Sequence, residues 1–510
     1  MGFYYFCLVL LFLFVFLLSY EIIKDIRKYS NYIFIILYCL ILTILFKYNF
    51  GIYFWGLEYE DAYSFSFCSR QFSYNIYPSS FLIDAISIGS LEEPISMFTY
   101  GGHFITYPTF LSIFTRVLGW SPLLISYINT FIAFVILIIL SLVGNRNRLW
   151  FIAPSLYCVA PIINVFATCF LSEIFSSLLC VSFIYSYLKP KTLINLSLCF
   201  LTFGLALLCK RENLALLFIP IIDSIIILYK TKNKNIIWEF IKYNAPYLSI
   251  VLIYIFGCQN IFNIESVESN DIGESTFSIS NFKYLFPAFI KSLLSIKDFS
   301  ITFYAYLASL MYILLQKKIV YKIQWISIVT FSIYLMLYTF HYRGYFFIRD
   351  KEVTSFETYR YINNFYYFIP LIFSSFLGFK TKISYIVTAI LLLLSLFQTF
   401  NLRNQYSNLE KENRFEEVEI VSKYIDKQNK KSILITENIL LYQNLCDAKF
   451  SVCDITHFYD LELEDSEFDY YCLFPNSDYL YQRYGIVINK KGFIPILQLP
   501  NNTYLYKYSP

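Results

Sequence analysis

The chain has 510 residues, of which 57% are hydrophobic and only 15% are charged, and its formal net charge is +4. Soluble domains carry about 25% charged residues, so this composition excludes an ordinary soluble globular protein and indicates a helical membrane protein. The small net charge, spread over short clusters, gives no support for a nucleic-acid partner, which would need a basic stripe.

Apolar runs recur along the first 400 residues. A transmembrane helix needs about 17 to 25 mostly apolar residues, and this criterion predicts about twelve spans. They are expected at 3–20, 31–46, 121–143, 149–167, 169–187, 192–209, 214–229, 240–257, 301–316, 323–340, 362–379 and 383–400. The expected fold class is therefore an all-α polytopic membrane protein.

Basic residues indicate which side of the membrane each connection faces. Clusters of Lys and Arg lie in alternate, short connections, a pattern typical of cytoplasmic loops. The clusters are Lys24/Arg27/Lys28, Arg146/Arg148, Lys189/Lys191, Lys230/Lys232/Lys234, Lys317/Lys318/Lys322 and Lys380/Lys382. The alternation places both termini on the outer face, together with the large first loop at 47–120 and the segments 258–300 and 341–361.

The composition changes after residue 400. Residues 1–400 form the predicted multi-span domain, whereas 401–510 are charged and mixed in character. Beyond a polar helical stretch, strand-like runs follow at 432–435, 470–474 and 485–488. The sequence therefore predicts a small extracytoplasmic α/β or α+β domain at this end of the chain.

Three carboxylates in four residues, Glu58, Glu60 and Asp61, follow the second predicted span. Charged groups at a membrane boundary are costly unless something uses them, and crowded carboxylates raise one another's pKa, which suits a general base. A transferase that moves a sugar from a phosphate-linked carrier needs such a base, and it needs cations for the departing phosphate. The alternative is a solvated loop with ordinary acidic residues.

Two adjacent cations, Lys210 and Arg211, stand next to Glu212 at the predicted outer end of a span. Their position runs against the usual excess of basic residues on the cytoplasmic side. A phosphate ligand would explain them. Snorkelling of long side chains at a helix end is the alternative.

Further candidates lie on the same predicted face. Arg343, Glu357 and Arg360 fill the last outer loop, which an ordinary charged loop would also explain. His103 lies in Gly-Gly-His-Phe-Ile-Thr-Tyr-Pro, ahead of a short amphipathic segment expected along the membrane interface. Glu173 is an ionisable residue near the outer end of a span and thus a functional candidate. A structural role is the alternative for both His103 and Glu173.

The order of these features resembles the C-type superfamily of integral-membrane glycosyltransferases, in particular the protein O-mannosyltransferase and lipid A aminoarabinose transferase branch. The resemblance covers most of residues 31–400. Many relatives carry Asp-Glu where this chain has Glu60-Asp61. The features that carry the resemblance are the acidic motif, the Gly-His-Phe-Ile-Thr-Tyr-Pro segment with its interfacial helix, Ser172-Glu173, Lys210-Arg211-Glu212, Glu357-Thr358-Tyr359-Arg360-Tyr361 and the soluble tail.

The resemblance implies a sugar donor linked to a polyprenyl or dolichyl phosphate, and inverting transfer at the outer face to a lipid-linked glycan or a protein. A first-loop acid would be the base, with Glu60 corresponding to the family's leading acid and Asp61 orienting it or helping to hold a metal. Some relatives use a divalent cation such as Mg²⁺ or Mn²⁺ and others do not, so a metal stays open. The residues expected to bind the donor phosphate are Lys210, Arg211, Arg343 and Arg360.

Two other functions stand as alternatives. An O-antigen-type polymerase also has many spans and outward basic loops, but the soluble tail and the early acidic motif argue against it. A flippase for lipid-linked oligosaccharides would fit the number of spans. Transporters usually show paired halves and interrupted helices near the midplane, and we detect neither. Richness in Ile, Lys, Asn, Phe and Tyr indicates an AT-rich genome, so we expect a bacterial cytoplasmic membrane.

Overall fold

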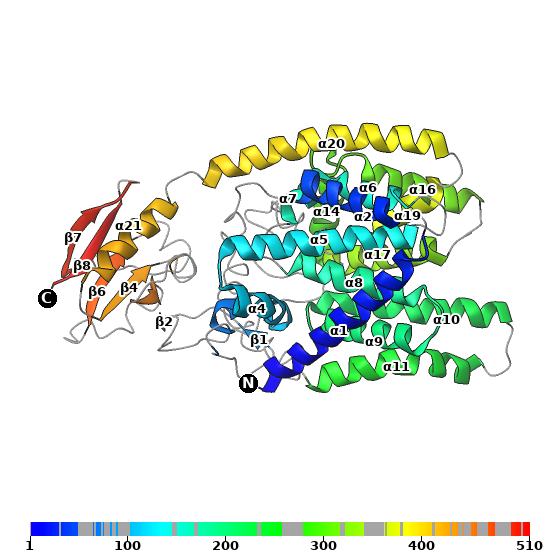
Figure 1. The fold of residues 1–510 in the computed structure, drawn as a ribbon, viewed down its shortest axis with the longest axis horizontal. Coiled ribbons are helices and arrows are strands. Elements are labelled where there is room, and N and C mark those ends of the chain that lie inside the picture. The colour runs from blue at the N-terminus through cyan, green and yellow to red at the C-terminus, as the bar shows by residue number, and fades with distance from the viewer. Residues whose placement is uncertain are drawn as a thin grey trace. The chain divides into compact units, whose positions relative to one another are not determined.

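A computed structural model gives the fold of the chain, which Figure 1 shows as a ribbon. The structure describes residues 2–29, 32–48, 65, 68–72, 75, 82–83, 88–89, 103–144, 150–167, 172–231, 236–257, 279–316, 322–340, 362, 365–377, 381–410, 414–428, 431–436, 442, 450–455, 468–474, 491–500 and 503–509. The chain divides into two compact units. The helical unit comprises residues 2–51 and 125–404, and the sheet unit comprises residues 52–124 and 405–510.

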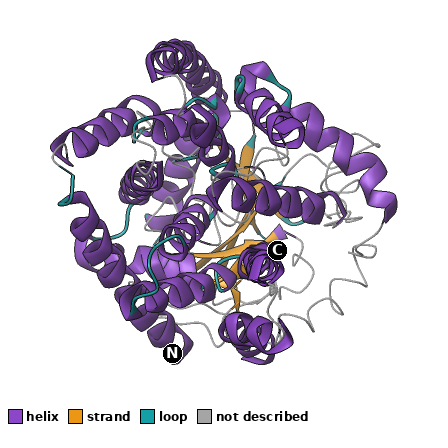
Figure 2. Ribbon diagram, turned by 90° about the vertical axis from the view of Figure 1, so that its right-hand side faces the viewer, coloured by secondary structure: helices purple, strands orange, loops and turns teal. Residues whose placement is uncertain are grey.

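Apolar runs fold as helices in the helical unit, because a helix pairs its backbone N–H and C=O groups within itself. Each predicted span contains at least one helix. Figure 2 looks along many of them, so they form a bundle. The helices are α1 (Gly2–Ile26), α2 (Tyr32–Leu42) with the π-helical turn η1 (Thr43–Lys47), α5 (Pro122–Gly144), α6 (Ile152–Cys158), α7 (Pro161–Phe166), α8 (Glu173–Tyr187), α9 (Leu193–Leu207), the 3-10 helix η3 (Arg211–Leu217), α10 (Phe218–Thr231), α11 (Ile236–Gly257), α14 (Ile279–Leu293), α15 (Ile296–Phe299), α16 (Thr302–Gln316), α17 (Lys322–Phe340), α19 (Phe368–Leu377) and α20 (Thr381–Glu410).

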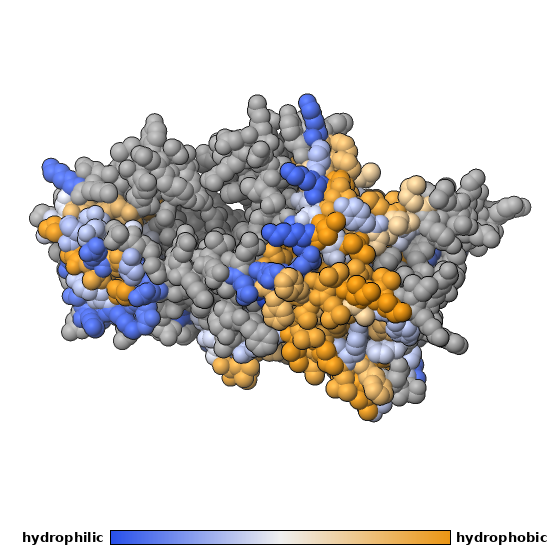
Figure 3. All heavy atoms as spheres, turned by 90° about the horizontal axis from the view of Figure 1, so that it is seen from above, coloured by the Kyte–Doolittle hydropathy of each residue, from blue (hydrophilic) through white to orange (hydrophobic). Residues whose placement is uncertain are grey.

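The outer surface of these helices suits a lipid environment. Phe16, Phe34 and Phe397 each expose about two thirds of their surface, at 68%, 68% and 69%. Figure 3 shows a dense field of hydrophobic residues over the helical unit. Of the described helices, five are long and apolar enough to cross a membrane: Gly2–Ile26, Leu124–Gly144, Trp238–Gly257, Lys322–Phe340 and Tyr385–Asn404. The protein is therefore a mostly helical, polytopic membrane protein, and the count of about twelve spans stays a prediction.

One predicted span, 149–167, is broken into the two short helices α6 and α7. Pro161 opens α7, where its lack of an N–H costs nothing. The break frees two backbone carbonyls, which side chains satisfy. Asn164 Nδ2 donates to the Cys158 oxygen at 2.7 Å, and Ser395 Oγ of α20 donates to the Val159 oxygen at 2.7 Å.

The basic cluster that follows α8 also has a structural role, because its Lys189 joins the end of α8 to α1. Lys189 is 7% exposed, and its Nζ lies 2.6 Å from Glu21 Oε2 and 2.7 Å from Asp25 Oδ2. Tyr185 of α8 also donates to Asp25 Oδ2, at 2.9 Å. Two carboxylates on α1 thus compensate a buried ammonium in the connection that follows α8, which fixes α1 against this connection.

The sheet unit is built around a mixed sheet with strand order β2-β5-β4-β6-β8-β7, in which β4 runs parallel to both β5 and β6. The predicted strands at 432–435 and 470–474 correspond to β4 and β6, and the one at 485–488 lies outside the described residues. The elements are β1 (Leu82–Ile83), β2 (Ile88–Gly89), β3 (His103–Phe104), α4 (Thr106–Leu118), α21 (Arg414–Asp426), β4 (Ser432–Thr436), β5 (Ser451–Asp454), β6 (Asp469–Leu473), β7 (Phe493–Gln498) and β8 (Tyr504–Tyr508).

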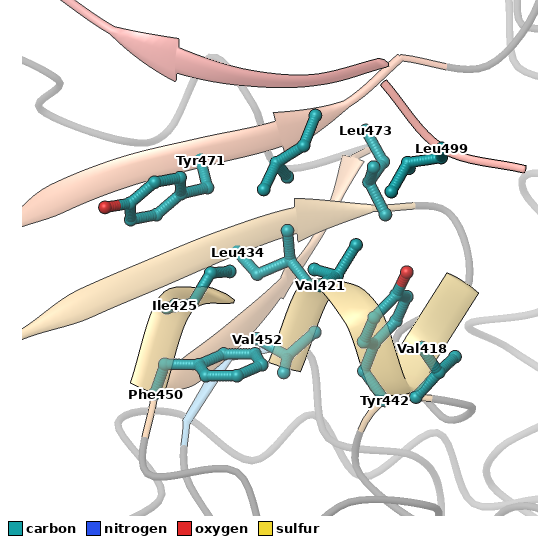
Figure 4. Close-up of a cluster of buried hydrophobic side chains, with 11 residues drawn as sticks. Val418, Val421, Ile425, Leu434, Tyr442, Phe450, Val452, Tyr471, Leu473 and Leu499 are labelled. Carbon is teal, nitrogen blue, oxygen red and sulfur yellow. The ribbon is translucent and has the colours of Figure 1, made fainter. Parts of the chain in front are cut away.

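Helix α21 covers one face of this sheet, as Figure 4 shows. Its Val421 and Ile425 pack with Leu434 of β4 in a buried cluster. The neighbours Ile433 and Ile435 belong to a second buried cluster, because successive side chains of a strand point to opposite faces. Burial on both faces is typical of a central strand with parallel neighbours.

The sheet also contains a strand from the first long loop. Ile88 of β2 pairs with Cys453 of β5, and Gly89 pairs with Val452, in antiparallel register. The unit therefore joins residues that are more than 350 positions apart in sequence. One of the paired strands, β2, precedes residue 400 and the other, β5, follows it.

Candidate functional site

Most of the predicted first-loop and last-loop residues lie outside the described part of the chain. Their roles stay predictions from the sequence. These residues are Glu58, Glu60, Asp61, Arg343, Glu357 and Arg360. The candidates that the structure does describe are His103, Glu173, Lys210, Arg211 and Glu212.

His103 lies in the sheet unit, in strand β3, where it pairs with Ile83 of β1. Helix α4 begins at Thr106, so the predicted amphipathic segment is helical. Arg116 ties this helix to the segment before it, because its Nε and Nη2 donate to the Phe72 oxygen at 3.0 and 2.9 Å. The other described candidates belong to the helical unit.

Glu173 and Lys210, predicted separately, meet in the structure. Lys210 Nζ donates to Glu173 Oε1 at 2.8 Å, and the side chains are 11% and 2% exposed. Glu173 is the first residue of α8, where a negative charge is favoured by the helix dipole. Lys210 has an extended backbone and directly precedes η3. The structure therefore makes a nearly buried ion pair from two of the predicted site residues.

A buried polar network begins three residues after each member of this pair, at Ser176 and Asn213, where the sequence analysis proposed nothing. Asn213 of η3 donates to Ser176 Oγ of α8 at 2.9 Å. Its Oδ1 accepts hydrogen bonds from Tyr334 of α17 at 2.6 Å and from the Cys180 thiol at 3.3 Å. Because buried polar groups without hydrogen-bond partners raise the free energy of the folded state, this network holds α8, η3 and α17 in a fixed arrangement.

The neighbours of the ion pair set the charge of this region. Arg211 and Glu212, in the first turn of η3, are half-buried. Together with Glu173 and Lys210 they give two positive and two negative charges. A phosphate bound by Lys210 would share the ammonium with Glu173, so this cluster offers a fixed donor rather than a strong excess of positive charge. Phosphate binding by Lys210 and Arg211 stays a prediction.

The structure also shows two buried cations that the sequence analysis missed. Lys47, the last residue of η1, has no exposed surface, and Arg403 of α20 is 5% exposed. Arg403 Nη2 donates to the Phe46 oxygen at 2.6 Å. Both side chains stand at predicted outer ends of spans, which is the signal that pointed to Lys210 and Arg211. Applied to single cations, that signal would have found them.

Solved structures of known proteins show the same fold. The crystal structure of ArnT from Cupriavidus metallidurans bound to undecaprenyl phosphate matches with a TM-score of 0.55 at 8% identity, over 94% of this chain and 98% of that chain. ArnT in the apo state matches with a TM-score of 0.56 at 9% identity, over 93% and 97%.

The structure of the Archaeoglobus fulgidus oligosaccharyltransferase in complex with Zn and sulfate matches with a TM-score of 0.50 at 11% identity, over 94% of this chain and 73% of that chain. The fold is that of the C-type glycosyltransferases. The resemblance inferred from the order of the motifs is thus confirmed for the C-type fold. No protein-family model matches the sequence, and no curated protein matches it in sequence.

The structure bears on only part of the predicted metal site. Within the described residues, no group of three or more His, Cys, Asp and Glu could hold a metal ion. Glu60 and Asp61, the predicted metal ligands, lie outside those residues. A divalent cation bound by these two carboxylates stays a prediction.

Proposed function

We propose that the protein is a membrane glycosyltransferase that moves a sugar from a polyprenyl-phosphate carrier to a hydroxyl group of a lipid-linked glycan or a protein. The observation that supports this most is the match to ArnT bound to undecaprenyl phosphate, which extends over 94% of this chain. The apolar helices place the protein in a membrane, where a polyprenyl carrier resides. A bacterial cytoplasmic membrane is part of the proposal.

In the proposed reaction, an oxygen of the acceptor hydroxyl attacks the anomeric carbon of the sugar. The bond from that carbon to the phosphate oxygen breaks, and its electron pair stays on the phosphate. The hydroxyl proton passes to a carboxylate, for which Glu60 is the first candidate and Asp61 and Glu58 are the others. A single displacement inverts the configuration at the anomeric carbon.

In this proposal, cations of the helical unit assist the departure of the phosphate. The phosphate gains a negative charge as the sugar leaves, and fixed positive groups stabilise such a charge best. Lys210 is fixed by its 2.8 Å contact with Glu173. Glu173 begins α8, whose other end is followed by the basic cluster at Lys189, so the pair stands at the predicted outer face. We therefore assign the reaction to that face.

The experiment supplies membranes that contain the protein with a panel of radiolabelled polyprenyl-phosphate sugars. Label is then measured in the lipid and protein fractions, with membranes that lack the protein as the control. Protein-dependent label in one fraction identifies the donor and the acceptor class together. No label from any donor would contradict the proposal and favour a polymerase or a flippase.

A further inference from the structure

A cavity of about 380 Å³ lies in the helical unit, at the end of α8 opposite Glu173. Its lining comes from the end of α8, the beginnings of α9 and α17, and turns of α10 and α11. The connections between these elements carry three of the predicted cytoplasmic lysine clusters. The cavity therefore lies at the predicted cytoplasmic face, and its volume is within the range of ligand pockets, about 300–1,000 Å³.

Positive charge is in excess in the lining of this cavity. The charged residues among its described lining are four lysines and one carboxylate, that of Asp223. Lys189 does not add to the excess, because carboxylates of α1 compensate it. Lys322 forms an ion pair with Asp223. The uncompensated charges that remain are those of Lys191 and Lys242.

Lys191 and Lys242 have no carboxylate partner among the described residues. Lys191 Nζ lies 4.5 Å from the ring centroid of Tyr243, a cation–π contact between the α8–α9 connection and α11. Lys242 precedes Tyr243 in α11, and both lysines are exposed, so a ligand can reach them from the surface. Because a ring face compensates only part of an ammonium charge, this end of the cavity still favours an anion.

The backbone on either side of Lys191 is held by hydrogen bonds. Asn195 Nδ2 donates to the Pro190 oxygen at 2.9 Å. The Asn195 N–H donates to Thr192 Oγ1 at 3.3 Å, so Thr192 caps the beginning of α9. Lys191 therefore extends from a fixed point of the chain, and binding of a ligand there has little backbone ordering to oppose it.

Trp238 indicates that the cavity lies at the level of lipid headgroups. Its side chain is 72% exposed, and it lies four residues before Lys242, so the two share one face of α11. Tryptophan is enriched where a membrane meets water. One turn further along α11 the lining becomes apolar, with Pro246 and with Phe200 of α9. A charged headgroup that is attached to acyl chains suits a cavity with these two ends.

We propose that this cavity binds the headgroup of an anionic phospholipid of the cytoplasmic leaflet, such as phosphatidylglycerol. Basic pockets between transmembrane helices on the cytoplasmic side suit such headgroups, because this leaflet contains anionic lipids. Lys191 and Lys242 bind the phosphodiester, and Phe200 and Pro246 contact the acyl chains. The bound lipid joins the α8–α9 connection to α11. This site is separate from sugar transfer, which we assign to the other face.

The test measures lipid binding to the purified full-length chain in a neutral detergent by native mass spectrometry, with phosphatidylglycerol and phosphatidylcholine as probes. The wild type is expected to bind phosphatidylglycerol more tightly, because phosphatidylcholine has no net charge. Lys191→Met and Lys242→Met are each expected to weaken phosphatidylglycerol binding about fivefold, the contribution of one lysine at an anionic membrane surface. Equal affinity of the wild type for the two lipids would overturn the proposal.

Two further variants separate a specific site from general attraction to a basic surface. Arg27→Met is the matched control, because Arg27 belongs to another predicted cytoplasmic cluster, is exposed and does not line the cavity. It is expected to leave phosphatidylglycerol binding unchanged. Lys242→Arg keeps the charge and is expected to bind as the wild type does. An equal loss of binding in Arg27→Met and Lys242→Met would overturn the proposal.

Asp223→Asn tests the site through a gain of binding. The substitution removes the negative charge of the lining and releases Lys322 from its ion pair. The folded variant is therefore expected to bind phosphatidylglycerol more tightly than the wild type. Such a gain cannot result from loss of folded protein. A weaker affinity of the folded variant for phosphatidylglycerol would overturn the proposal.

An inorganic phosphate arm separates a lipid headgroup from a free phosphate as the ligand. Inorganic phosphate is expected to compete only weakly with phosphatidylglycerol, because it has no acyl chains to contact the apolar end of the cavity. Binding of inorganic phosphate that depends on Lys191 and Lys242, combined with phosphatidylglycerol binding that does not, would overturn the lipid as the ligand.

Discussion

Lys210 and Glu173 form a 2.8 Å ion pair that joins the start of η3 to the start of α8. Asn213, three residues after Lys210, belongs to a separate buried network with Tyr334 and Ser176. This arrangement positions one ammonium for the proposed departing phosphate, and it makes the region sensitive to single substitutions.

The first prediction concerns this pair. Glu173→Gln leaves the Lys210 ammonium nearly buried without its carboxylate, and breaking a buried pair in this way costs about 3 kcal/mol. We expect a lower melting temperature in detergent and slower sugar transfer. The double variant Glu173→Gln/Lys210→Met is expected to lose less stability than the sum of the two single variants, because it carries no uncompensated charge. Strict additivity would contradict the coupling.

The second prediction concerns the network behind the pair. Tyr334→Phe removes the donor at 2.6 Å from Asn213 Oδ1 and is expected to cost about 1–3 kcal/mol, because the amide oxygen stays buried. Thermal unfolding of the purified chain measures this cost. Tyr304→Phe is the control, since Tyr304 is 41% exposed and donates to the Leu294 oxygen. Equal losses in the two variants would show that burial of the network is unimportant.

The third prediction concerns pH and the sheet unit. The hydrogen bond to Asp469 raises the pKa of Lys507 above its ordinary value of 10.5. A raised folded-state pKa stabilises the fold below the unfolded value, and this stability is lost as the pH rises through the folded-state pKa. Unfolding measured from pH 9 to pH 12 should therefore show falling stability above about pH 10.5.

Two variants check the origin of this alkaline loss. Asp469→Asn is expected to reduce the slope of stability against pH, because it removes the partner that raises the Lys507 pKa. Lys423→Met is the control, since Lys423 and Glu419 form an ion pair with side chains that are 69% and 65% exposed, and such pairs contribute little. An unchanged slope in Asp469→Asn would contradict the assignment.

The fourth prediction concerns a turn of the sheet unit. Gly492 has a φ of +86°, and a Cβ built on it would lie 2.6 Å from a ring carbon of Tyr508. Gly492→Ala is expected to cost about 2 kcal/mol or more, from backbone strain and from the displaced ring. Gly119→Ala isolates the backbone part, because Gly119 has a φ of +79° and no atom of the described residues lies within 4 Å of a Cβ built on it. A larger loss for Gly119→Ala in thermal unfolding would contradict this account.

The helices could be predicted from the sequence because an apolar run of sufficient length carries its own signal. The break between α6 and α7 was missed, since the carbonyls it frees are satisfied by Asn164 and by Ser395 of a distant helix. Helix α14 was missed as well. It lies in the expected outer loop at 258–300, where Lys283, Pro287 and Lys291 interrupt the apolar pattern.

In the candidate site, too, the residues with a local sequence signal could be predicted and the contacts between distant residues could not. Glu173 and Lys210 could each be proposed from their position at a span end, but no local pattern predicts that residues 37 apart would form an ion pair. Arg403 and Phe46 are 357 residues apart, so their contact depends wholly on packing. The pairing of Ile88 with Cys453 was missed for the same reason.

The measurement that tests the central claim most directly compares sugar transfer by the wild type, Glu60→Gln and Asp61→Asn. Membranes with equal amounts of folded protein receive the radiolabelled polyprenyl-phosphate sugar that the wild type uses. Loss of a general base slows a reaction about a hundredfold or more, so we expect at least one variant to lose nearly all incorporation. Full incorporation by both variants would contradict a catalytic acidic motif.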